Sequence, residues 1–135
     1  MTRILLLAAL LAATPALAQK VDPGEWEITS IVSGAMFPKP ETRVEMHCVK
    51  KEAVDEPKRW MGQTGADCAV TPVKEGADHY SWTVACPKSA MRGSGSMRWT
   101  RTTVDIEMDL VSEQQGKKVE MRSKVSGRRI GPCKG

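Results

Sequence analysis

Four cysteines are the residues of this chain with the strongest capacity for chemistry. They are Cys48, Cys68, Cys86 and Cys133. An even number of widely spaced cysteines predicts two disulfides in an oxidising compartment. The alternative is zinc, but there is no Cys-x-x-Cys pair, and His47 and His79 are the only imidazoles. We therefore favour disulfides and expect neither a metal site nor a cofactor.

The catalytic alternatives are weaker. The sequence contains no Gly-x-Ser-x-Gly, phosphate-loop or His-x-x-Glu-type motif. A nucleophile also needs a base within hydrogen-bond reach. His47 is expected to point away from the core beside an oxidised Cys48, and His79 falls at a predicted turn. The sequence therefore predicts a protein that is not an enzyme.

Methionine and tryptophan recur on the inward side of the predicted strands. These side chains are Trp26, Met46, Trp82, Met97, Trp99, Met108 and Met121. Methionine is adaptable enough to line a pocket, so they can form a cup for a small apolar ligand. The other interpretation is that they fill a core that lacks leucine, since such residues are usually buried. A copper site is disfavoured because no Met-x-Met or Met-x-His spacing occurs.

Basic residues gather near the C-terminus. The candidates for contact with an anionic component of the cell envelope are Lys117, Lys118, Arg122, Lys124, Arg128 and Arg129. The alternative is a solvated face that a neighbouring acidic strand partly neutralises. Nucleic acid is disfavoured because exposed aromatic residues are not interleaved with these cations.

Two-residue periodicity predicts the strands that position these residues. Over 103–112 apolar side chains alternate with Asp105, Glu107 and Asp109, and over 119–125 they alternate with basic residues. A polar turn joins the two strands, so they form a hairpin with Leu110 opposite Met121. The same register places acidic side chains opposite basic ones on the outer face.

A second hairpin joins 68–73 to 79–86. Its register sets Cys68 opposite Cys86, Val70 opposite Val84 and Pro72 opposite Trp82. Directly opposed residues of an antiparallel pair lie within disulfide range. We therefore predict a Cys68–Cys86 disulfide, which leaves Cys48 to pair with Cys133.

Three more strands are expected at 26–32, 43–49 and 89–100, together with one short helix within 50–62. The inward side chains of the first two are Trp26, Ile28, Val44, Met46 and Cys48. Short turns without helical crossovers predict an all-β antiparallel meander. It would form a strongly curved sheet or an incomplete barrel.

The N-terminus has the pattern of a secretory signal peptide. Arg3 precedes an apolar run from Ile4 to Ala13, and Ala16-Leu17-Ala18 provides the small residues of a cleavage site. Ten apolar residues are about half of what a bilayer-spanning helix needs. We expect a signal-peptide helix in residues 1–18, cleavage after Ala18, and a periplasmic product that does not span the membrane.

Residues 19–135 are expected to form a single disulfide-stabilised domain. Leu110 is the only leucine in this part, whereas valine occurs twelve times. That composition favours pleated sheet over helix. It also predicts a thin core, which cross-links compensate.

Five short motifs resemble a known family. They are Pro23-Gly24-x-Trp26-Glu27, Cys48, Trp82-Thr83-Val84-x-Cys86, Met91-x-Gly93-x-Gly95 and Gly127-Arg128-Arg129-Ile130-Gly131-x-Cys133. Across residues 22–133 the chain resembles the domain-of-unknown-function 3617 family of small exported proteobacterial proteins. The resemblance implies a periplasmic location and a β-rich fold, and it implies no activity, catalytic residue or cofactor.

Two functions follow as hypotheses. The first is a monomeric, non-enzymatic binding protein that holds a small apolar ligand or an envelope partner. The second is a structural or stress-related envelope protein that has no small ligand.

Overall fold

The computed structural model describes residues 20–53 and 67–134. It contains strands and two single turns of 3-10 helix, η1 (Lys51–Ala53) and η3 (Pro87–Ser89). The strands are β1 (Gly24–Gly34), β2 (Glu41–Val49), β3 (Ala69–Glu75), β4 (His79–Cys86), β5 (Met91–Trp99), β6 (Thr103–Gln114) and β7 (Lys117–Gly131). The predicted signal-peptide helix lies outside the described residues. So does the part of the predicted 50–62 helix beyond η1.

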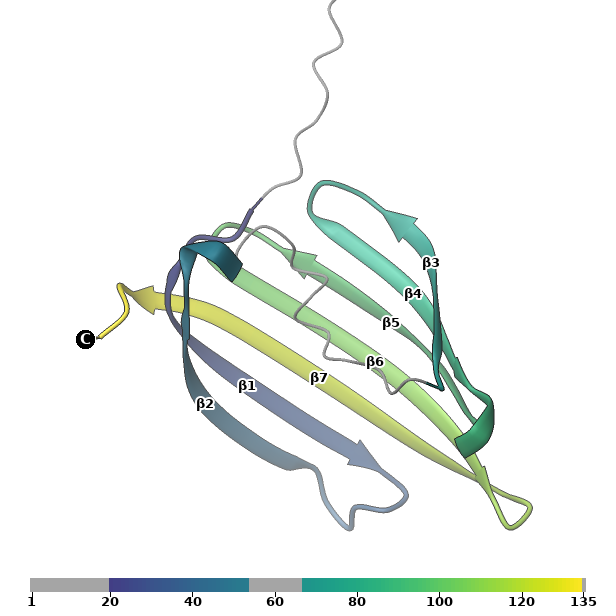
Figure 1. Cartoon of the computed structure of the whole chain (residues 1–135). Helices are drawn as coiled ribbons and strands as arrows, with labels where there is room; N and C mark the ends of the chain where they lie inside the picture. Colours follow the sequence, from purple (N-terminus) through teal and green to yellow (C-terminus); the bar gives the residue numbers. More distant parts are fainter. Residues whose placement is uncertain (1–19, 54–66, 135) are drawn as a thin grey trace, which may run out of the picture.

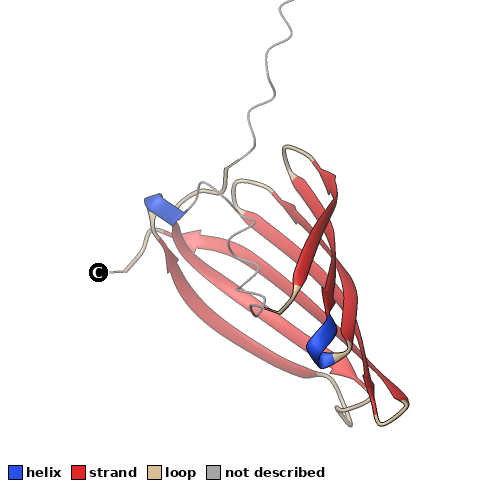
Figure 2. Ribbon diagram, turned by 45° about the vertical axis from the view of Figure 1, so that its right-hand side comes forward, coloured by secondary structure: helices blue, strands red, loops and turns tan. Residues whose placement is uncertain are grey.

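The strands form one antiparallel sheet in the order β2-β1-β7-β6-β5-β4-β3. Consecutive strands from β3 to β7 pair with one another, and β7 then pairs with β1. The result is a meander that curls like a barrel but remains open between β2 and β3 (Figures 1 and 2). The predicted all-β meander with an incompletely closed sheet is confirmed.

The predicted registers of both hairpins are also confirmed. In the β6–β7 hairpin Leu110 pairs with Met121 and Ile106 with Val125. In the β3–β4 hairpin Val70 pairs with Val84 and Pro72 with Trp82, after which a bulge shifts the register. The two apolar patterns fixed these registers because a slip of one residue would turn each apolar face toward water.

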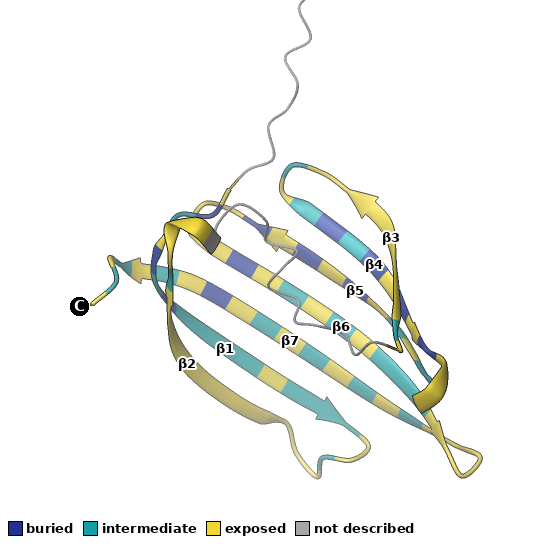
Figure 3. Cartoon of the chain, viewed as in Figure 1, coloured by how far each residue is buried: buried dark blue, intermediate teal, exposed yellow. Residues whose placement is uncertain are grey.

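On β4 the buried residues run along the whole strand, whereas on β1, β5 and β6 they lie toward one end (Figure 3). The register places the buried side chains of the strands on one face of the sheet, here called the inner face, and the core packs there. The core residues are Val21, Trp26, Tyr80, Trp82, Val84, Cys86, Met97, Trp99 and Val104. Tyr80 and Trp82 stack with ring centroids 5.4 Å apart. The Trp82 indole occupies the space where a side chain at Gly95 would be, so a Cβ there would collide with it. Gly95 therefore allows a large aromatic ring to lie flat on the neighbouring strand.

The orientation predicted for β2 is wrong. Met46 pairs with Glu27, and Cys48 pairs with Glu25, so both lie on the outer face, as does Val44. The Met46 side chain is 46% exposed. On an edge strand that is exposed on both sides, alternation of polar and apolar residues does not establish which side is inward. His47, which was expected outside, lies on the inner face opposite Trp26.

Both predicted disulfides are present. Cys68 is bonded to Cys86, and Cys48 is bonded to Cys133 across 85 residues of sequence. Two disulfides indicate an oxidising compartment outside the cytoplasm. Within the ranges 20–53 and 67–134, no helix has the length and hydropathy required to cross a bilayer.

Candidate functional site

The inner face has two regions that differ in burial. In one region its aromatic side chains are buried. Beyond them an apolar row on β6 and β7 stays partly exposed, and we call this row the inner strip. It consists of Ile106, Met108, Leu110, Met121 and Val125. The strip continues the core without being sealed by it, so it presents apolar surface on the inner face to a ligand.

The register explains why these five side chains form one surface. Ile106 pairs with Val125, Met108 with Ser123, and Leu110 with Met121. Directly paired residues of antiparallel strands point to the same side and lie about 5 Å apart. The strip is therefore continuous across two strands, and the Ser123 hydroxyl is the polar group within it.

The structure separates the seven side chains expected to line an apolar cup. Trp26, Trp82, Met97 and Trp99 belong to the buried core. Met108 and Met121 are partly exposed in the inner strip. Met46 is on the opposite face, for the reason given above. Four of the seven side chains thus fill the core, and two, Met108 and Met121, are exposed enough on the inner face to contact a ligand.

Three basic residues of β7 lie on the outer face opposite acidic ones. Arg122 binds Asp109 at 2.6 Å, Lys124 binds Glu107 at 3.2 Å, and Arg128 binds Glu27 at 2.9 Å. The contacts of Arg122 and Lys124 match the cross-strand pairing expected from the sequence, and the Arg128–Glu27 contact joins β7 to β1. Three of the six cations that were expected to contact an anionic envelope component are therefore already paired with carboxylates of the same chain.

The other three cations differ in their surroundings. Arg129 donates from Nε to the Pro23 carbonyl at 2.8 Å and so fixes the start of β1. Lys117 and Lys118 are exposed where β7 begins. The outer face is therefore a surface of alternating charges rather than a basic one.

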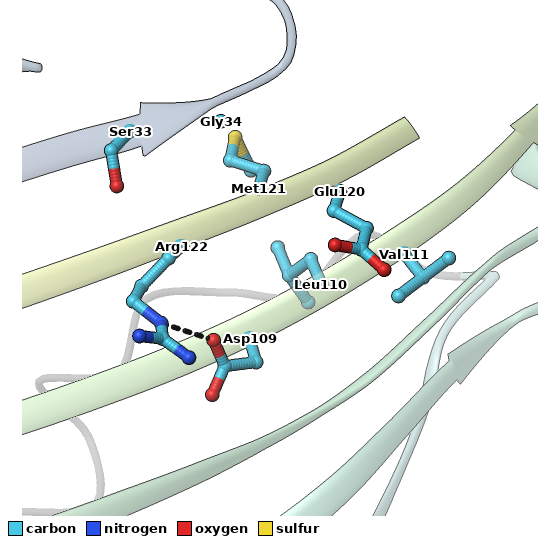
Figure 4. A pocket seen from close by; sticks show the side chains of 8 residues that line it. All are labelled: Ser33, Gly34, Asp109, Leu110, Val111, Glu120, Met121 and Arg122. Atoms are coloured by element: carbon cyan, nitrogen blue, oxygen red, sulfur yellow. Dashed lines mark hydrogen bonds and ion pairs between the residues drawn. The ribbon is translucent and has the colours of Figure 1, made fainter. Parts of the chain in front are cut away.

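One hollow of about 440 Å³ opens where β1 ends and β6 and β7 continue as a ribbon (Figure 4). Ser33, Arg122 and Asp109 follow one another across its wall in register. The hydrogen bond from Arg122 to Asp109 raises the pKa of the guanidinium. Because that cation is neutralised by its partner, the hollow does not offer a free positive charge to an anionic ligand.

The two histidines lie far apart in the sheet, each beside a carboxylate. His79 Nδ1 is 2.9 Å from Asp78 Oδ1, and this hydrogen bond lowers the pKa of the Asp78 carboxyl. His47 Nε2 is 3.1 Å from Glu45 Oε2. Both pairs are exposed. Across the described part of the chain, His, Cys, Asp and Glu side chains do not form a group of three that could hold a metal ion.

Tyr80 and Val21 are core residues that were not predicted from the sequence. Tyr80 shares its strand parity with Trp82 and Val84, so the alternation of β4 could have identified it. Val21 is buried although it precedes β1. It lies in no periodic segment, so the sequence contains no pattern that marks it.

Comparison with known protein families gives one match. The family described as "Protein of unknown function (DUF3617)" matches residues 21–133. No curated protein and no solved structure matches the chain significantly. The family match covers every described strand, from Gly24 in β1 to Gly131 in β7.

Proposed function

The chain belongs to the DUF3617 family of proteins of unknown function, and from that premise we propose that it is a non-enzymatic periplasmic binding protein whose inner strip holds a small apolar molecule. The observation that carries this proposal is the partial exposure of the strip on the inner face of an open sheet. Apolar surface of this kind gains free energy when a ligand removes it from water, at about 25 cal/mol per Å².

The chemistry of the strip favours an elongated, uncharged ligand segment such as an acyl chain. Its five side chains are aliphatic or thioether groups, and methionine adapts to ligands of different shape. The charged pairs lie on the outer face, so the strip itself has no ion with which to recognise a charged group. Affinity would come from apolar contact.

The periplasmic part of the proposal concerns residues 1–18. We expect the protein recovered from the periplasm of a Gram-negative host to begin at Gln19, as measured by intact mass. Ala18→Asp should cause the precursor to accumulate, because signal peptidase requires a small residue before the cleaved bond. Gln19→Glu, which changes the residue after that bond, should still be processed. Recovery of the unprocessed wild-type chain from the periplasm would contradict the proposal.

Ligand binding can be tested with N-phenyl-1-naphthylamine, an apolar fluorescent probe. Met108→Gln should weaken binding of the probe about tenfold, because it replaces an apolar contact of the strip with an amide. Glu107→Gln is the matched control, since the neighbouring side chain points to the outer face. It should bind the probe like the wild type. Thermal unfolding of both variants would establish that the fold is retained.

Native mass spectrometry of the wild-type protein supplies the second measurement. An additional lipid-like mass on the periplasmic protein would support the proposal. A clean apo mass together with no binding of the probe would contradict it. The structural envelope role, which needs no small ligand, would then be the better description.

A further inference from the structure

The two edges of the open sheet differ in how they are protected. Edge strand β3 contains Pro72 and a bulge between Pro72 and Lys74, and both features prevent another strand from pairing with it. Edge strand β2 has neither a proline nor a bulge, and it pairs with β1 in continuous register from Glu41 to Val49. It is thus a regular strand that pairs with β1 on one edge and with no other described strand on its second edge (Figure 1).

The side chains of β2 are exposed on both faces of the strand. Every residue from Glu41 to Cys48 is exposed. Val44 and Met46 are 59% and 46% exposed on the outer face, and Ile31 of β1 is exposed beside them. An apolar patch next to an unprotected strand margin is a typical site for strand addition.

The charges of the inner-face side chains of β2 indicate which strand can pair with this edge. They are Glu41, Arg43, Glu45 and His47. When two copies of β2 pair antiparallel about a two-fold axis, residues of equal parity face one another, because opposed residues point to the same side. With the axis at Val44, Arg43 faces Glu45 of the other copy and Glu41 faces its His47. Arg43 thus faces a carboxylate of the other copy, and no two residues of like charge lie opposite each other.

Neighbouring registers are less favourable. An axis at Arg43 sets that residue against its own copy and Glu41 against Glu45. An axis at Glu45 sets Glu45 against itself and Arg43 against His47. Like charges directly opposite each other are destabilising in a sheet. Among the registers that pair at least seven residues of β2, with axes at Val44, Glu45 or Met46, the Val44 axis alone sets Arg43 opposite a carboxylate. The charge order of β2 therefore favours that pairing.

We propose that the β2 edge is a self-association surface, at which two copies of this chain pair antiparallel through residues 41–47 with Val44 on the two-fold axis. This revises the monomer expected from the sequence. In the pair, Val44 meets its copy on the outer face, and Met46 meets Thr42. The exposed apolar patches of the two copies thereby join and lose contact with water.

Sedimentation equilibrium of the oxidised, mature chain tests the proposal. The wild type should form a reversible dimer. Arg43→Glu should raise its dissociation constant roughly 30-fold, because two pairs per dimer change from attraction to repulsion. Arg43→Glu combined with Glu45→Arg should return the constant to within a few-fold of the wild type. Arg92→Glu makes the same change of charge on central strand β5 and should leave the dimer intact.

Three results would overturn the proposal. They are a wild type that stays monomeric at millimolar concentration, a dimer that Arg43→Glu does not weaken, and a charge-swapped double variant that does not recover. In the monomer Arg43 lies opposite Ser30 and forms no ion pair with a described residue, so its replacement leaves the fold in place. Far-UV circular dichroism of each variant would verify this.

Discussion

A chain in which Cys48 and Cys133 are both alanine should lose about 4.5 kcal/mol of unfolding free energy. The disulfide between them spans 85 residues of sequence, and a cross-link over a loop of that size removes about this much entropy from the unfolded chain. Small domains are stable by only 5–15 kcal/mol in general. The variant should therefore be marginally folded or unfolded at 25 °C, as urea titration followed by circular dichroism would show.

The position of this disulfide explains why the expected loss is so large. Cys48 is near the end of β2, and Cys133 follows β7, while β1 lies between these two strands. The cross-link therefore closes three neighbouring strands into one unit. The matched comparison is Cys68→Ala with Cys86→Ala, which opens a loop of 18 residues and should lose about 3 kcal/mol from chain entropy.

A second measurement distinguishes the entropic explanation from local damage. Removing the Cys48–Cys133 cross-link should also increase the urea m-value, because the unfolded chain becomes more expanded and exposes more surface. A loss of less than 1 kcal/mol with an unchanged m-value would show that β2 and the C-terminus are held together by other contacts.

The second large effect is expected for Trp26→Ala, which should lose about 3–5 kcal/mol of unfolding free energy. The Trp26 side chain is 0% exposed. Its Nε1 also donates to the Asp22 carbonyl at 3.1 Å, so the indole fixes the segment before β1. Replacement by alanine leaves a cavity and an unpaired carbonyl. Urea unfolding measures the loss.

Met46→Ala is the control for this prediction. The pattern of alternation assigned Met46 and Trp26 to the same face, but the register places them on opposite faces. Because Met46 is largely exposed, its replacement should change the free energy of unfolding by less than about 1 kcal/mol. Equal losses for the two variants would mean that β2 packs the other way round, with Met46 inside.

The sequence was sufficient for those features that depend on local alternation. The β6 and β7 strands each have a strict apolar row, and their complementary outer charges gave a second, independent indication of the same register. The Cys68–Cys86 disulfide followed from the β3–β4 register alone. Such features depend only on contacts between the two strands of one hairpin, which lie close together in the sequence.

The features that depend on contacts between residues distant in sequence could not be predicted from the alternation of polar and apolar residues. The face of β2 is set by its pairing with β1, because both of its faces are wet and its own residues do not distinguish them. The burial of Val21 comes from tertiary packing of a segment outside any strand. Whether a methionine belongs to the core or to the inner strip depends on its distance from the aromatic cluster, which alternation does not reveal.

The central position of β7 affects the order in which the protein acquires its structure. Among the described strands, β7 is the last in the sequence and pairs with the first, β1, since Gly127 lies opposite Ile28. Contacts between residues so distant in sequence form slowly, because a long loop must close before they can stabilise anything. The Cys68–Cys86 hairpin can mature while the chain is still incomplete. The Cys48–Cys133 bond can form only after Cys133 has been synthesised, so Cys48 waits for its native partner longer than Cys68 does.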